Sequence, residues 1–148
     1  MRKLLILVLP LVVAGCQLVE DKDDAALNAA SGWAEAYFNC DYQEAGKYAT
    51  EESGKWLRFA ASNTTDDDLQ VLQQAGGVQV TADEYFTVAN DTLRQVTLHV
   101  SNFLATGTLG QPARIADRGT FVVTLVNRNG KCKVRMEGLP RNERQSRD

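Results

Sequence analysis

Hydrophobic positions follow two different periods along this chain, and the change falls near Gly77. Before Gly77, apolar side chains recur every three or four residues, as they do on the buried face of an amphipathic helix. One such stripe is formed by Ala26, Ala30, Trp33 and Tyr37, and it predicts a helix over residues 23–38. The same spacing predicts three further helices, at residues 42–49, 51–61 and 65–75. In the second of these, Trp56, Phe59 and Ala60 share the face that is expected to be buried.

Polar residues mark where two of these helices begin. Asp41 is followed three residues later by Glu44, which is a variant of the capping box. Thr65 is followed by the three carboxylates of residues 66–68, whose charge opposes the positive end of a helix dipole. Their spacing does not match the alternating ligands of an EF-hand calcium loop. We therefore interpret residues 66–68 as charges that stabilise the first turn of a helix, and we expect no metal site there.

After Gly77 the period becomes two, as in strands with one buried face. Strands are expected at residues 78–88, 96–101, 120–126 and 131–137, with a glycine-rich loop over residues 105–118. The third strand is apolar on both faces, which indicates a central position. Asn129-Gly130 predicts a two-residue type I′ hairpin before the last strand. Helices followed by strands indicate an α+β domain, with the N-terminal helices packed on one face of a curved, roughly four-stranded antiparallel sheet.

The first fifteen residues have the composition of a secretory signal peptide. Two cations precede a run of about ten apolar residues that ends in small side chains. Residues 4–14 are too few to cross about 30 Å of hydrocarbon, which needs about 20 residues. The Val-Ala-Gly-Cys sequence at residues 13–16 resembles the lipobox of bacterial lipoproteins. That resemblance implies an acylated Cys16, and Gln17 after it is typical of lipoproteins sorted to the outer membrane. The sequence does not decide between the periplasmic and the surface-facing side of that membrane.

These features divide the chain into four parts: a signal peptide (1–15), a tether (16–22), a single α+β domain (23–138) and a polar tail (139–148). Removal of Arg2 and Lys3 leaves 14 cations against 19 anions, and the cations concentrate in the sheet half. Either each half is simply solvated on its outer side, or the basic half faces an anionic partner such as a phosphorylated glycan or a lipid headgroup. Overall acidity and the absence of a recognition motif argue against nucleic acid.

Two cysteines remain after lipidation, Cys40 and Cys132. An even number of cysteines in an exported protein predicts a disulfide, which would stabilise the fold by about 4–5 kcal/mol. A zinc tetrad is not expected, because these cysteines have only the lone histidine, His99, to join them. We expect neither a metal nor another cofactor.

The segment at residues 33–45, WAEAYFNCDYQEA, resembles the nuclear transport factor 2-like superfamily, also described as cystatin-like cones. The resemblance extends over residues 23–138. It implies a curved sheet that encloses a conical cavity, which some members use for proton-transfer catalysis, others for ligand binding and others for dimerisation. A fold shared by such different functions does not by itself assign one.

The strand pattern nominates few chemical groups. Glu84 shares the parity of Val80 and Ala82, so an unbroken strand would point it into the cavity, where a carboxylate could act as a base. Alternatively, Asp83 and Glu84 mark a bulge and Glu84 is solvated. His99 falls on the polar parity and should be exposed.

A row of cations near the last hairpin either binds a partner or protects an edge strand from aberrant pairing. The row comprises Arg128, Lys131, Lys133 and Arg135. The whole pattern predicts a lipid-anchored, non-catalytic envelope domain that binds a protein or a small ligand. The alternatives are a small-molecule enzyme or ligand-binding cone that uses Glu84, and a structural homodimer formed through the outer sheet face.

Overall fold

The computed structural model describes residues 22–88, 92–105 and 113–143. Helices come first and strands second, as the change of period predicted. The helical elements are α1 (Lys22–Phe38), α2 (Tyr42–Tyr48), the short 3-10 helix η1 (Glu51–Ser53), α3 (Gly54–Ser62) and α4 (Asp66–Gln74). The strands are β1 (Gln79–Val88), β2 (Leu93–Ala105), β3 (Arg114–Arg128) and β4 (Lys131–Arg135).

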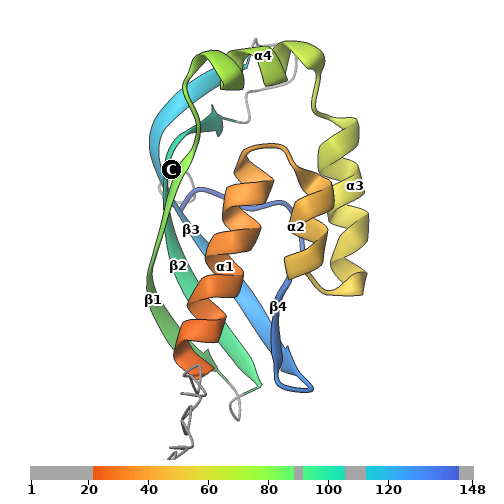
Figure 1. The fold of residues 1–148 in the computed structure, drawn as a ribbon, viewed down its shortest axis with the longest axis vertical. Helices are drawn as coiled ribbons and strands as arrows, with labels where there is room; N and C mark the ends of the chain where they lie inside the picture. The colour runs from red at the N-terminus through yellow and green to blue at the C-terminus, as the bar shows by residue number, and fades with distance from the viewer. Residues whose placement is uncertain (1–21, 89–91, 106–112, 144–148) are drawn as a thin grey trace, which may run out of the picture.

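The strands form one antiparallel sheet in the order β1-β2-β3-β4. The sheet curves around α1, with α2 and α3 beside α1 and α4 across one end (Figure 1). We call the sheet face that packs against the helices the inner face, and the opposite one the outer face. The predicted α+β class is confirmed. Among the described residues, we find no helix that combines the length and the apolar character needed to cross a membrane.

The core lies between α1 and the inner face of β2 and β3. Ala26 and Ala30 are completely buried, and their small side chains let the helix backbone approach the sheet closely. Trp33 is 1% exposed and supplies the largest buried side chain at this contact. Opposite them, β2 presents Val96 and Leu98, both at 0% exposure. The helical stripe and the strand alternation thus meet as the sequence predicted.

The predicted cap at Asp41 is present, and α4 begins with a capping box at Thr65. Asp41 Oδ1 accepts a hydrogen bond from the Glu44 backbone N–H at 3.1 Å. At α4, the Thr65 hydroxyl accepts from the Asp68 N–H, and the Asp68 carboxylate accepts from the Thr65 N–H at 2.8 Å. These bonds satisfy N–H groups that have no partner inside a helix.

Two expectations about individual segments are wrong. Phe59 was predicted to lie on the buried face of its helix, but it is 52% exposed, and α3 buries Leu57 and Ala60 instead. Residues up to Arg118 were predicted to be loop, but β3 already begins at Arg114 and pairs with the end of β2. In both cases the partner element, which is distant in sequence, decides the outcome.

The predicted disulfide is absent, because Cys40 and Cys132 are free thiols in this structure. The strand parity was read correctly, since Cys132 packs against the core. Cys132 and Cys40 are nevertheless far apart, because Cys132 lies at the hairpin end of β4. Cys132 follows the β3–β4 hairpin at the end of the molecule where α1 begins, whereas Cys40 follows the other end of α1 (Figure 1). A helix of 17 residues is about 25 Å long, and a disulfide needs Cα atoms within about 7 Å.

A buried hydroxyl ties the helical layer to the edge of the sheet. Ser53 is completely buried, and its Oγ accepts the Met136 N–H at 2.8 Å. The same oxygen lies 2.8 Å from the Thr50 hydroxyl, and the Thr50 N–H donates to the Val134 carbonyl at 2.9 Å. The chain around η1 is therefore fastened to β4 and the residues after it.

Asn102 joins α4 to β2. Its side-chain amide donates to the carbonyls of Ala75 and Gly77 at 2.6 and 2.8 Å, and its own φ is +62°. Asparagine tolerates this left-handed conformation better than most residues. We expect Asn102→Ala to lower the free energy of unfolding by about 1–2 kcal/mol, through the lost bonds and the backbone strain. Urea denaturation measures this loss. Asn102→Gly relieves only the strain and should fall between wild type and the alanine variant; equal stability of all three proteins would contradict the prediction.

Candidate functional site

A bulge in β1 determines what the outer face of the sheet presents. Ala82 pairs with Leu98, but Glu84 pairs with Thr97, so Asp83 is an extra residue in the strand. A bulge of this kind shifts every later residue to the other face. The register therefore places Glu84 opposite an outer-face threonine, whereas Ala82 lies opposite a buried leucine.

The interpretation of Glu84 as a cavity base is corrected by this register. It assumed an unbroken strand, and the strand is interrupted at the preceding residue. The bulge that the sequence left open as an alternative is the one found. The side chain of Glu84 lies outside the described part of the structure.

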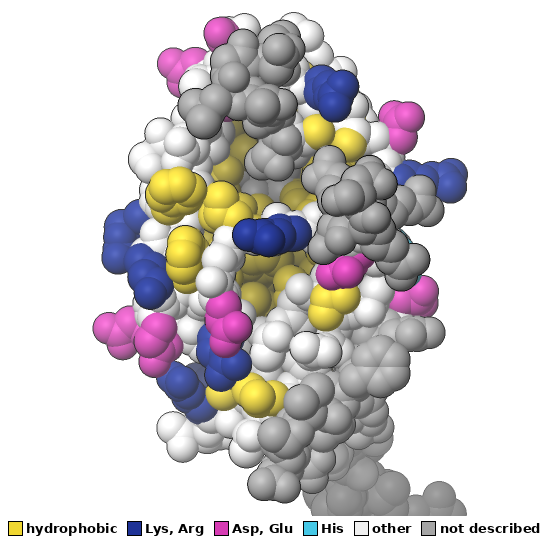
Figure 2. All heavy atoms as spheres, turned by 180° about the vertical axis from the view of Figure 1, so that it is seen from behind, with side chains coloured by type: hydrophobic (Ala, Val, Ile, Leu, Met, Phe, Trp, Pro, Cys, Tyr) yellow, Lys and Arg dark blue, Asp and Glu magenta, His cyan; other side chains and the backbone are white. Residues whose placement is uncertain are grey.

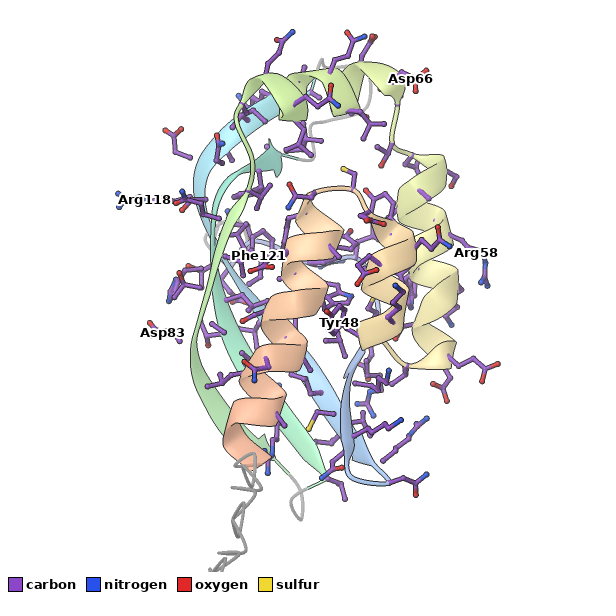
Figure 3. The ribbon with its side chains drawn as sticks, viewed as in Figure 1. Tyr48, Arg58, Asp66, Asp83, Arg118 and Phe121 are labelled. Carbon is purple, nitrogen blue, oxygen red and sulfur yellow. The ribbon has the colours of Figure 1, made fainter. Side chains whose placement is uncertain are left out.

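The bulge brings Asp83 to the histidine of the neighbouring strand. Asp83 Oδ2 lies 3.2 Å from His99 Nε2, and the two side chains are 62% and 48% exposed. His99 is thus on the outer face, as its parity predicted. Figure 3 shows Asp83 and Arg118 pointing away from the helices on this side of the sheet. The strand pattern alone could not pair Asp83 with His99, because their contact depends on the bulge.

The other ring nitrogen of His99 faces β3. Its Nδ1 lies 3.5 Å from Oγ1 of Thr120, the residue directly opposite in the register. Ser101 and Arg118 form the next outer-face pair along the same two strands. These four residues, with the backbone of Val100 and Gly119, line a shallow groove of about 390 Å³.

An aspartate, a histidine and a hydroxyl in a row also occur in hydrolytic triads. Such a triad also needs hydrogen-bond donors near the hydroxyl that have no other partner, so that they can stabilise the oxyanion. Here the backbone donor nearest the hydroxyl is already engaged. The Thr120 N–H donates to Asn142 Oδ1 at 3.2 Å, and the Thr120 carbonyl accepts the Glu143 N–H at 2.8 Å. The row is also open to water. This geometry suits ligand binding better than acyl transfer.

The interior of the cone is filled with aromatic rings. The centroids of Phe38, Phe103 and Phe121 lie 4.7–5.6 Å apart, and Trp33 stacks on Tyr37 at 4.8 Å. Among the described residues, the buried polar or charged ones are Thr50, Ser53 and Arg94. A packed interior of this kind leaves the described part of the cone without an evident proton-transfer site.

Two tyrosines and a cysteine near the end of α1 have raised pKa values. Burial, with a smaller contribution from Cys40, raises the pKa of Tyr37 to about 12. Burial also raises the pKa of Tyr42, whose hydroxyl lies 2.8 Å from Thr64 Oγ1. The pKa of the Cys40 thiol is raised in the same way, which argues against a reactive thiolate.

The face of the molecule seen from behind carries a hollow. Figure 2 shows hydrophobic side chains gathered in this hollow, with one basic side chain lying across it. Such a surface offers apolar contact and shape rather than acid–base chemistry.

The predicted cation row does not form an open basic surface. Arg128 Nη1 lies 3.1 Å from Glu52 Oε1, and Arg135 Nη2 lies 3.0 Å from Glu137 Oε1. Lys133 Nζ donates to the backbone carbonyl of Lys47. Lys131 is exposed at the hairpin. The structure therefore brings the four residues to one edge, where three of them contact groups of the same chain.

Within the described ranges, no three His, Cys, Asp or Glu side chains are grouped closely enough to hold a metal ion.

No protein-family model and no curated protein matches this chain. Among solved structures it is similar to an NTF-2-like protein of unknown function from Shewanella oneidensis MR-1, at 13% identity and a TM-score of 0.49 over 75% of this chain and 92% of the other. An uncharacterised cystatin-fold protein from Novosphingobium aromaticivorans is 16% identical, with a TM-score of 0.42 over 74% and 95% of the two chains. A putative polyketide cyclase from Xanthomonas campestris pv. campestris is 11% identical, with a TM-score of 0.40 over 79% and 93%. The first two carry the fold names that the resemblance at residues 33–45 predicted.

Proposed function

We propose that this protein is a lipid-anchored domain of the bacterial envelope that binds a ligand or partner without turning it over. The observation that carries the binding role is the outer-face groove. It gathers an arginine, a histidine and two hydroxyls where solvent can reach them. The backbone donor nearest to Thr120 Oγ1 is already bonded, which disfavours acyl-transfer chemistry there.

The anchor rests on the lipobox-like sequence that ends at Cys16. α1 begins at Lys22, at the end of the molecule opposite α4 (Figure 1). Six residues of extended chain reach at most about 20 Å, so acyl chains on Cys16 would hold the domain close to the bilayer. One acyl chain gives only marginal binding, whereas two or more anchor a protein durably. The groove would then be presented to molecules at the membrane surface.

The anchor predicts the mass of the protein purified from bacterial membranes. We expect a chain that begins at Cys16 and carries added acyl mass, measured by intact-protein mass spectrometry. Cys16→Ala should abolish both the processing and the added mass, because the thiol is the attachment point. Cys40→Ala is the matched control, and it should keep the acyl mass and the membrane fraction. A wild-type protein with Met1 intact and no added mass would exclude the anchor.

A further inference from the structure

We propose that the outer-face groove binds an oxyanion, a phosphate, sulfate or carboxylate group, between the Arg118 guanidinium and the hydroxyls of Ser101 and Thr120, and that protonation of His99 strengthens this binding. The inference deepens the proposed function, because it names the ligand class of the same groove. It does not depend on the lipid anchor.

Arg118 is the cation that makes the groove suitable for an anion. It is exposed on the outer face and points away from the helices (Figure 3). Among the described residues no carboxylate pairs with it, in contrast to Arg128 and Arg135. A free guanidinium presents a planar fork of N–H donors, which matches the oxygens of phosphate and carboxylate groups.

The hydroxyls of Ser101 and Thr120 complete the site beside Arg118 on the outer face. Ser101 lies directly opposite Arg118, and Thr120 lies opposite His99 in the adjacent pair. Diagonal neighbours on one face of an antiparallel pair are about 7–8 Å apart, so one anion placed between them can reach both pairs. All four residues line the same groove.

His99 couples the site to pH through the Thr120 hydroxyl. In the neutral ring, the proton on Nε2 is directed to Asp83, so Nδ1 can only accept the hydrogen of the Thr120 hydroxyl. When Nδ1 gains a proton, it donates to Thr120 Oγ1 instead. The hydroxyl hydrogen is then free to bond the anion. Protonation therefore adds one donor and one positive charge to the groove.

Charged groups around His99 come from both neighbouring strands. Asp83 faces it from β1, and Arg118 lines the same groove from β3. Glu143 is exposed on the C-terminal segment that pairs with Thr120. Asp83 accepts from Nε2 whether His99 is neutral or protonated, so the only hydrogen bond of His99 that protonation changes is the one between Nδ1 and Thr120.

Sulfate is the appropriate first probe, since its charge is constant between pH 5.5 and 7.5. Histidine is the side chain that ordinarily changes charge in this interval. We expect titration of the mature protein in a neutral detergent to shift the backbone amide resonances of Ser101, Arg118 and Thr120. The dissociation constant should be about tenfold lower at pH 5.5, which is the lower end of what an added hydrogen bond to a charged group is worth. An unchanged dissociation constant would overturn the coupling to His99.

Four variants separate the contributions. Arg118→Gln should weaken sulfate binding about tenfold at both pH values, whereas Arg58→Gln removes the same charge from α3 and should change it less than about twofold. Thr120→Val should retain binding and lose the part of its pH dependence that comes from the hydroxyl, leaving the part that comes from the charge on His99. Thr120→Ser should restore the full dependence. Equal affinities of Arg118→Gln and wild type would overturn the site itself. That result would leave the mass measurement on Cys16 unaffected, so the two proposals fail separately.

Two further probes identify the source of the anion. Glycerol 3-phosphate presents a free phosphate ester, and vesicles with phosphatidylglycerol present a phosphodiester at a membrane. Arg118-dependent binding of glycerol 3-phosphate alone would support a soluble ligand, and Arg118-dependent binding of the vesicles would support a lipid headgroup. If Arg118→Gln changes neither interaction, a phosphate ligand is excluded.

Discussion

Trp33→Ala is expected to lower the free energy of unfolding by about 3–5 kcal/mol, which is the usual cost of truncating a large buried aromatic side chain. Trp33 is 1% exposed at the centre of the contact between α1 and the sheet. It stacks on Tyr37 at 4.8 Å and meets the edge of Phe38 at 6.4 Å, so its removal opens a cavity inside an aromatic cluster. A domain of this size is stable by about 5–15 kcal/mol, so the variant should be close to unfolding at 25 °C.

Urea denaturation followed by far-ultraviolet circular dichroism measures this loss, and Trp33→Phe is its control. The indole Nε1 of Trp33 is buried without a hydrogen-bond partner among the described groups. Phenylalanine keeps an aromatic ring and removes this unsatisfied donor, so we expect it to recover more than half of the loss. If the phenylalanine variant is as unstable as the alanine variant, the packing of the ring is not the main contribution of this residue.

Gly119→Val is expected to cost about 3 kcal/mol, at the upper end of the range for overpacked cores. A Cβ at this position would lie 2.7 Å from Phe103 Cζ and 2.9 Å from Phe121 Cε2. Both rings are at least 95% buried and also pack against Phe38, so neither can move away without displacing the cluster. The strain therefore spreads through the core.

The matched control is another glycine of the same chain. A Cβ added to Gly138 meets nothing within 4 Å, so Gly138→Val should change the unfolding free energy by less than about 0.5 kcal/mol. Thermal denaturation of the two variants side by side makes the comparison. Similar melting temperatures for both would show that the cluster adapts to the extra methyl groups.

The candidate groove was only partly visible in the sequence. His99 was expected on the outer face, because the alternation of polar and apolar residues within β2 can be read directly from the local sequence. Arg118 was assigned to a loop, because residues 114–118 show little alternation and become a strand by pairing with the end of β2. The contact of Asp83 with His99 was missed for a different reason. A dipeptide of two acids is compatible with a continuous strand or a bulge, and the register with β2 decides between them.

The two cysteines illustrate the same limit. Counting cysteines in an exported chain predicts a disulfide, and strand parity turned Cys132 toward the core. Neither the cysteine count nor the strand parity predicts where β4 lies along the length of α1. That position follows from the hairpin at Asn129 and from the contact of β4 with η1, and it leaves the two thiols at opposite ends of the helix.

By itself the sequence determined the order of helices and strands, the caps at Asp41 and Thr65, the hairpin at Asn129 and the inner faces of α1 and β2. These features depend on interactions between residues within a few positions of each other, so the local sequence is enough to predict them. Only the tertiary structure decided the bulge at Asp83, the exposure of Phe59 and the gathering of His99 and Arg118 in one groove. Those features depend on register and packing between segments far apart in the chain, where several local patterns fit equally well and the contacts select one.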